Sequence, residues 1–393
     1  MSDRSIKREN GFSLMEMTIA MGLGTLVLGV ALQLYSQGVS ATWTVSQRAE
    51  LQQDFRAASD MLIKDLSLAG SGLGNGTNIP LPSGTAPVYG CDQTPKCYLG
   101  STNLVSGKYP LQSGTPTLYG LMPGYNLGPT LTSNPSATDV VTVAYADSTF
   151  YLNCYSATIS ASDKVTFAPA SPPAWPVGCL PNGVAAPQTV NDTMLGLTPG
   201  DLVFFPAWNM VGEVTAGTIT TGTVTVNGTN YPTYIVPFAN GDVLNMNQTP
   251  AGATAGLNTV ALNSSGASPV RLLVITYYID NTVSPARLMR QISGHSPMPV
   301  ADGIVYMKFS YDLFNDATNL PAVNQPNPGS GDANDTASNG LNPTAITKIN
   351  ILHMAMDSTL HGAKGYQGLD LETSVSARDL TYTDAYPIGA SNQ

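Results

Sequence analysis

One carboxylate interrupts the most apolar stretch of the chain. Residues 12–35 read FSLMEMTIAMGLGTLVLGVALQLY, and Glu16 is the only charged side chain among them. A carboxylate inside a membrane-spanning helix costs about 2.5–3.5 kcal/mol on insertion scales, and such groups are functional by default. A buried charge is tolerated only when it is paired. We therefore expect Glu16 to have a function and a partner.

The element that carries Glu16 is expected to be an apolar helix. Residues 12–35 cover about 36 Å as a helix, enough for a hydrocarbon core of about 30 Å. Arg4, Lys7 and Arg8 precede this stretch, which predicts a cytoplasmic N-terminus and an exported remainder. A secretory signal cleaved near residues 39–41 and a plain signal anchor are the ordinary alternatives. Neither alternative explains Glu16.

The residues around Glu16 resemble a known processing site. Gly11-Phe12-Ser13-Leu14-Met15-Glu16 is similar to the cleavage site of type IV prepilins, with a glycine, a phenylalanine and a glutamate as the fifth mature residue. The resemblance implies a leader peptide over residues 1–11. It implies cleavage between Gly11 and Phe12 by a prepilin peptidase, which N-methylates Phe12. It also implies that Glu16 meets the N-terminal amine of a neighbouring subunit during assembly.

The C-terminal third narrows the resemblance. VRLLVITYYID (270–280), VADGIVYMKFSYDLF (300–314) and ETSVSARDLTY (372–382) follow an order that resembles the PilW-type minor pilins of type IV pili, with Asp379 where asparagine is usual. The resemblance implies a minor pilin that helps to initiate pilus assembly, at or near the tip. Its partners would be other major and minor pilins. It would lie in the bacterial inner membrane, single-pass, before assembly and in a periplasmic or cell-surface pilus afterwards.

Two other functions stay open at this point. A J-type pseudopilin of type II secretion is closely related and has the same N-terminal features. A membrane-anchored exported binding protein or adhesin belongs to a different class, because its anchor would not need Glu16. The chain is not expected to be an enzyme, because it contains neither a GxSxG nucleophile elbow nor a phosphate-binding P-loop.

The helix is expected to continue beyond the membrane. Apolar residues recur at helical spacing, which predicts one buried face: Leu51, Phe55, Ala58, Leu62, Leu66 and Ala69. The glycine-rich run 70–76 then ends the helix. A helix over 12–69 would be about 87 Å long. Its part 12–35 would lie in the membrane or filament core, and its part 36–69 would pack on a globular head.

The head, residues 70–393, is expected to be rich in antiparallel β-strands. β-branched and aromatic runs bounded by Gly, Pro, Asn or Asp predict strands at 139–145, 201–205, 217–226, 270–279 and 347–356. Residues 70–135 are predicted to be a long irregular excursion, and 315–343 a second insertion. The expected fold class is therefore α+β, with a long N-terminal helix on a large β-rich head.

Four cysteines favour two disulfides in an exported chain. Three pairings are possible, and we favour the pairing closest in sequence, Cys91–Cys97 and Cys154–Cys179. A zinc site is the weaker alternative, because the spacings differ from paired CxxC knuckles and no histidine lies near in sequence.

Charge and composition exclude several other kinds of site. The formal net charge of −10 and the lack of a basic run beyond residue 8 argue against binding to nucleic acid. Three histidines, His295, His353 and His361, show no helical metal-site spacing. Asp332 and Asp335 offer oxygen ligands for Ca²⁺, although a solvated loop explains them better. No cofactor is expected.

Overall fold

The computed structural model describes most of the chain between Gly11 and Leu380. The described residues are 11–73, 78–82, 88–94, 97, 117–131, 134–161, 163–170, 175–176, 179–180, 186–247, 257, 260–261, 264–315, 320–326, 328, 343, 346–357, 368–377 and 380. They form one long helix and a large antiparallel β-rich body, so the fold class is α+β.

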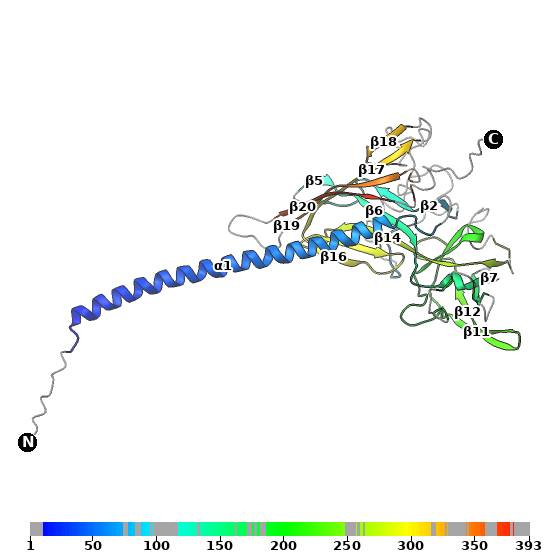
Figure 1. The fold of residues 1–393 in the computed structure, drawn as a ribbon, viewed down its shortest axis with the longest axis horizontal. Coiled ribbons are helices and arrows are strands. Elements are labelled where there is room, and N and C mark those ends of the chain that lie inside the picture. The colour runs from blue at the N-terminus through cyan, green and yellow to red at the C-terminus, as the bar shows by residue number, and fades with distance from the viewer. Residues whose placement is uncertain are drawn as a thin grey trace, which may run out of the picture.

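The helix, α1, runs from Leu14 to Ser67 over 54 residues, about 81 Å. Its N-terminal half projects freely from the β-rich body (Figure 1). Three residues beyond its last residue, Gly70 takes a φ of 80°, a left-handed conformation that costs glycine little. The Gly70 amide donates to the Ala144 carbonyl oxygen at 2.8 Å. The helix is therefore two residues shorter at each end than the predicted span of 12–69.

The described strands form three larger sheets and two small ones, and every pairing among them is antiparallel. The seven-stranded sheet contains β3 (Leu121–Gly124), β6 (Val140–Ala146), β9 (Leu202–Phe205), β10 (Met210–Glu213), β14 (Val270–Asp280), β15 (Arg287–Ile292) and β16 (Met298–Asp302). The four-stranded sheet has the order β18 (Leu320–Gln325), β17 (Ile304–Asn315), β19 (Ile346–Asp357) and β20 (Gly368–Ser376).

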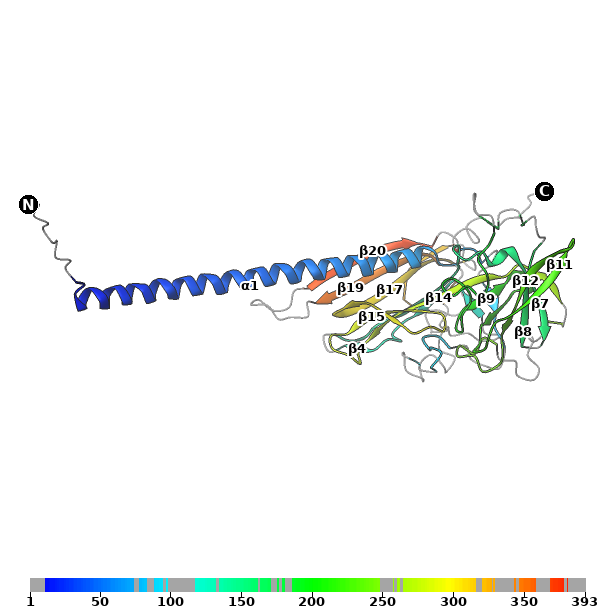
Figure 2. The same ribbon diagram turned by 90° about the horizontal axis from the view of Figure 1, so that it is seen from below.

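The third sheet lies at the end of the molecule far from the N-terminus (Figure 2). Its order is β11 (Thr220–Val226), β12 (Thr229–Pro237), β8 (Lys164–Pro169), β7 (Tyr155–Ala161) and β13 (Ser265–Ala267). The small pairs join β1 (Asn78–Pro80) to β2 (Thr117–Tyr119) and β4 (Thr130–Leu131) to β5 (Asn134–Ala137). Two 3₁₀ turns complete the described elements, η1 (Leu152–Cys154) and η2 (Pro206–Trp208).

Strand β14 explains how the cores are divided. Successive side chains of a strand point to opposite faces of the sheet. Ile275, Tyr277 and Ile279 therefore join the core that contains α1, whereas Leu272, Val274 and Tyr278 join a second core on the other face. Strand β9 alternates in the same way between the second core and a third, which lies under the five-stranded sheet.

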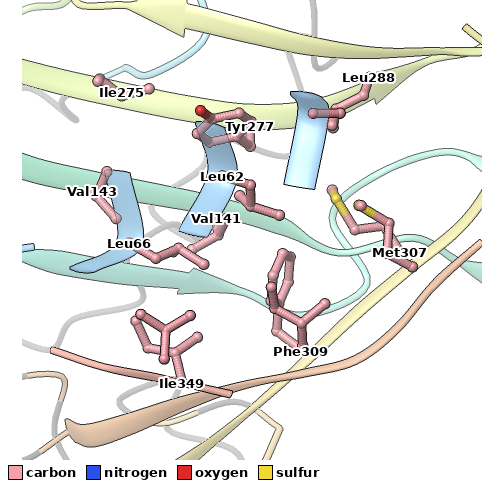
Figure 3. Close-up of a cluster of buried hydrophobic side chains, with 14 of the residues drawn as sticks. Leu62, Leu66, Val141, Val143, Ile275, Tyr277, Leu288, Met307, Phe309 and Ile349 are labelled. Carbon is pink, nitrogen blue, oxygen red and sulfur yellow. The ribbon is translucent and has the colours of Figure 1, made fainter. Parts of the chain in front are cut away.

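The first core joins the helix to two sheets. Leu62 and Leu66 of α1 meet residues of the seven-stranded sheet and of the four-stranded sheet (Figure 3). The labelled partners are Val141, Val143, Ile275, Tyr277 and Leu288 from the first sheet and Met307, Phe309 and Ile349 from the second. Burial of apolar side chains stabilises a contact by roughly 25 cal/mol per Å², so this core fixes the helix on the head.

The predicted strands correspond to β6, β9, β11, β14 and β19, with ends that differ by a few residues. The prediction of an irregular segment over 70–135 was wrong in part, because β1 to β4 and the start of β5 lie within it. These strands have two to four residues each, too few to show a periodic pattern. The second insertion, 315–343, likewise contains β18.

Candidate assembly site

The N-terminal half of α1 presents an apolar surface to its surroundings. From Gly11 to Glu50 no side chain is buried. Leu14 is 83% exposed and Trp43 is 61% exposed. Among the described helices, α1 alone is long and apolar enough to cross a membrane. From Leu51 onward, one face of the same helix is buried in the head.

The first turn of α1 is closed by a capping box. Ser13 is the N-cap, and its Oγ accepts a hydrogen bond from the Glu16 amide at 3.2 Å. In return, the Ser13 amide donates to Glu16 Oε2 at 3.0 Å. Two amide groups that have no partner within the helix are thereby satisfied. Glu16 therefore stabilises its own helix, a local role that the sequence analysis did not assign.

The residues of the expected cleavage site lie just outside this cap. Gly11 and Phe12 precede the helix, and Phe12 is 88% exposed. A side chain added at Gly11 would meet no atom within 4 Å. The carboxylate of Glu16 lies in the first helical turn, close to the positive end of the helix dipole, which favours a negative charge there. Residues 1–10 of the expected leader lie outside the described residues.

The other end of α1 is held by a buried ionic cluster. Asp65 is only 2% exposed. Its carboxylate accepts hydrogen bonds from Tyr145 Oη at 2.9 Å, Tyr277 Oη at 2.6 Å and Arg290 Nε at 2.7 Å. Burial, and then the charge of Asp65, raises the pKa of both tyrosine hydroxyls. The cluster ties the helix to β6, β14 and β15, the centre of the seven-stranded sheet.

The sequence analysis missed this cluster. A signal was present, because Asp65 lies three positions after Leu62 and directly before Leu66, on the face of the helix that the apolar pattern marks as buried. A charged residue on such a face requires partners. What the pattern could not give was their identity, since Tyr145, Tyr277 and Arg290 come from strands 80 to 225 residues away.

The four cysteines form two disulfides in the head. Cys91 is bonded to Cys97, and Cys154 is bonded to Cys179. This is the pairing that we favoured from the sequence, and it leaves no free cysteine for a zinc site. Cys91 lies in the second core, and Cys154 and Cys179 in the third. Disulfides persist in oxidising compartments, which agrees with an exported head.

The remaining candidates are placed as follows. Asp332, Asp335 and His361 lie outside the described residues, as does Asp379. His295 Nε2 lies 2.9 Å from Asp201 Oδ1, and His353 Nδ1 lies 3.0 Å from Asp370 Oδ2. Thus the structure brings two of the three histidines next to carboxylates, which their sequence spacing did not suggest.

Comparisons with models of protein families, with curated proteins and with solved structures find no match.

Proposed function

We propose that this chain is a PilW-type minor pilin, made as a prepilin and incorporated into a type IV pilus at or near its tip. The observation that supports this most is the division of α1. One half is apolar and exposed, and the other half is locked into the head by the first core and by Asp65. Such a subunit can exchange lipid for neighbouring apolar helices without unfolding its head.

The charge pattern supports the same proposal. Glu16 is the only charged residue from Phe12 to Gln47. Cleavage after Gly11 would create a positive amine on Phe12, four positions before Glu16. The attraction between opposite charges becomes stronger where water is excluded. The amine of one subunit and Glu16 of the next would therefore pair most strongly inside a filament. In the filament, the Glu16 carboxylate would accept from the Phe12 amine of a neighbouring subunit as well as from the Ser13 amide of its own chain.

A pair of variants separates these two roles of Glu16. Glu16→Gln keeps an oxygen that accepts from the Ser13 amide, since glutamine also completes a capping box, but removes the charge. Ser13→Ala keeps the charge and removes the hydroxyl cap, at a cost of about 1 kcal/mol of helix stability. Both variants are expected to insert and to be cleaved. Immunoblots of sheared filaments should contain the Ser13→Ala protein and lack the Glu16→Gln protein.

The converse result decides between classes of function. If Glu16→Gln chains enter filaments as the wild type does, the carboxylate has no part in assembly. A membrane-anchored binding protein predicts that neither substitution matters. If deletion of the gene blocks enzyme secretion and leaves pili intact, the chain is a pseudopilin instead.

The tip position rests on the size of the head, which carries three cores beside one helix. A head this bulky would obstruct regular packing along a shaft. Immunogold labelling of the head is therefore expected at filament ends, and even labelling along every filament would contradict the tip assignment.

A further inference from the structure

Three side chains of metal-ligating types meet on the four-stranded sheet. They are His353 of β19 and Asp370 and Glu372 of β20. One ligand atom from each lies within 4.8 Å of the other two. His353 Nδ1 and Asp370 Oδ2 are 3.0 Å apart.

A β-bulge in β19 turns His353 outward. Ile351 is 1% exposed and Met354 is 0% exposed, so both face the core, although residues three apart in a regular strand point to opposite faces. The register with β17 and with β20 shifts at this point. The extra residue leaves both Leu352 and His353 directed away from the core. Bulges often re-aim a side chain next to a functional site.

Strand β20 supplies the two carboxylates by simple alternation. Asp370 and Glu372 are exposed, whereas Leu369 and Leu371, which alternate with them, pack against the first core. Two carboxylates two residues apart on one face repel each other unless a cation lies between them. Among the described residues, the one ion pair that either carboxylate makes is the contact of Asp370 with His353.

The geometry suits a small divalent transition metal ion. Ligand atoms about 2.1 Å from a tetrahedral zinc ion stand about 3.4 Å from one another, a value between the 3.0 Å of the His353–Asp370 contact and the 4.8 Å limit of the group. One imidazole nitrogen with carboxylate oxygens is a set that zinc accepts. Calcium prefers six to eight oxygen ligands, so the imidazole argues against it.

A pocket adjoins one of the three ligands, His353. Its volume is about 490 Å³, and His353 forms part of its wall together with Tyr125, Tyr306 and Leu352. The ring of Tyr306 meets the His353 ring edge-on, with centroids 4.9 Å apart, which orients the imidazole. Lys308 also lines this pocket, and its ammonium lies 2.7 Å from the Asp139 carboxylate, so its charge is already balanced. Lys308 would therefore not repel a metal ion bound at the rim of the pocket.

We propose that His353, Asp370 and Glu372 bind a divalent transition metal ion of the zinc class, and that the bound ion completes the rim of this pocket. Three protein ligands leave a fourth tetrahedral position open. Water, or an oxygen atom of a molecule held in the pocket, takes that position. The head therefore carries a metal-dependent binding site that is separate from the assembly helix.

Calorimetric titration of the full chain in detergent, after treatment with a chelator and its removal, tests this directly. ZnCl₂ is expected to bind at one ion per chain and more tightly than CaCl₂ or MgCl₂. His353→Ala and Glu372→Gln should each weaken zinc binding by at least about tenfold, the scale already reached when a supporting residue is lost. Both positions are at the surface, and circular dichroism should show an unchanged fold.

His295→Ala is the matched control. His295 also contacts a carboxylate, at 2.9 Å from Asp201, and its side chain has the same 36% exposure as that of His353, but no third ligand joins it among the described residues. This variant should bind zinc as the wild type does. The proposal fails if the wild type binds no zinc, if His353→Ala binds it unchanged, if His295→Ala loses it, or if calcium binds more tightly.

Discussion

Asp65 connects the helix to the head through three hydrogen bonds to side chains of the seven-stranded sheet. A buried carboxylate of this kind is stabilised by its partners, and removing one member of a buried ion pair leaves the other uncompensated. If Asp65 is removed, Arg290 is the charge left without its partner, because its side chain is only 19% exposed and its Nε donates to Asp65. Asp65 therefore stabilises the contact between the helix and the head.

Asp65→Asn is accordingly expected to lower the free energy of unfolding by about 3–5 kcal/mol. Asp60→Asn, an exposed position on the same helix, should change it by less than about 0.5 kcal/mol. Urea unfolding of both variants in detergent measures the difference. Equal effects would mean that the Asp65 cluster does not hold the helix.

A second buried carboxylate, Glu213, is expected to make the stability of the head depend on pH. It is fully buried, and its oxygens accept from Gln93 Nε2 at 2.7 Å and the Leu244 amide at 2.8 Å. Burial, and then the neighbouring Asp242, raises the pKa of Glu213 to about 8. The pKa of Asp242 is raised as well, mainly by burial. At a pH between 4.5 and about 8, the folded head therefore keeps a proton on this pair of carboxylates, whereas the unfolded chain has released it.

The sign of the pH dependence follows. Between the ordinary value of 4.5 and about 8 the folded state binds more protons at Glu213 than the unfolded state, so the unfolding free energy falls as pH rises through this window. Urea unfolding at a series of pH values measures this dependence. Between pH 5 and about 8, the unfolding free energy of Glu213→Gln should change less with pH than that of the wild type. Glu50→Gln, on the exposed face of α1, should leave the pH dependence unchanged. A wild-type slope that persists in Glu213→Gln would contradict the assignment.

At the scale of elements, α1 is one helix with two environments. The apolar pattern at 51, 55, 58, 62, 66 and 69 predicted its buried half, because periodicity of 3.6 requires only local sequence. The sequence also contained the Ser13–Glu16 capping box. By contrast, β1 to β5 are too short for a pattern, and the bulge at Leu352 and His353 depends on two neighbouring strands. Those features could not be predicted from local sequence.

Two leucines test the independence of the two halves of the helix. Leu62 is 0% exposed and Leu26 is 65% exposed. Leu62→Ala should lower the unfolding free energy of the head by about 2–5 kcal/mol, because it leaves a cavity in the first core. Leu26→Ala, with the same change of side chain, should lower it by less than about 0.5 kcal/mol. Chemical unfolding followed by tryptophan fluorescence measures both losses. A comparable loss in the two variants would contradict the prediction and would show that the exposed half supports the head.

For the whole molecule, the class of fold and the disulfides were predictable, whereas the division of the head into three cores was not. Strong apolar runs such as 270–279 mark central strands, but the partners of those strands are set by contacts across long sequence separations, such as Leu272 with Leu202 and Ala146. The metal-ligating group was equally hidden, since His353 and Glu372 are 19 positions apart. Its members meet only through the pairing of β19 with β20.

All of the proposed assembly chemistry begins with cleavage between Gly11 and Phe12. Intact mass and N-terminal sequencing of the protein extracted from membranes test that step most directly. The account predicts a mature chain that starts at N-methylated Phe12. A chain that starts at Met1, or at Thr42 after removal of a secretory signal, would contradict it.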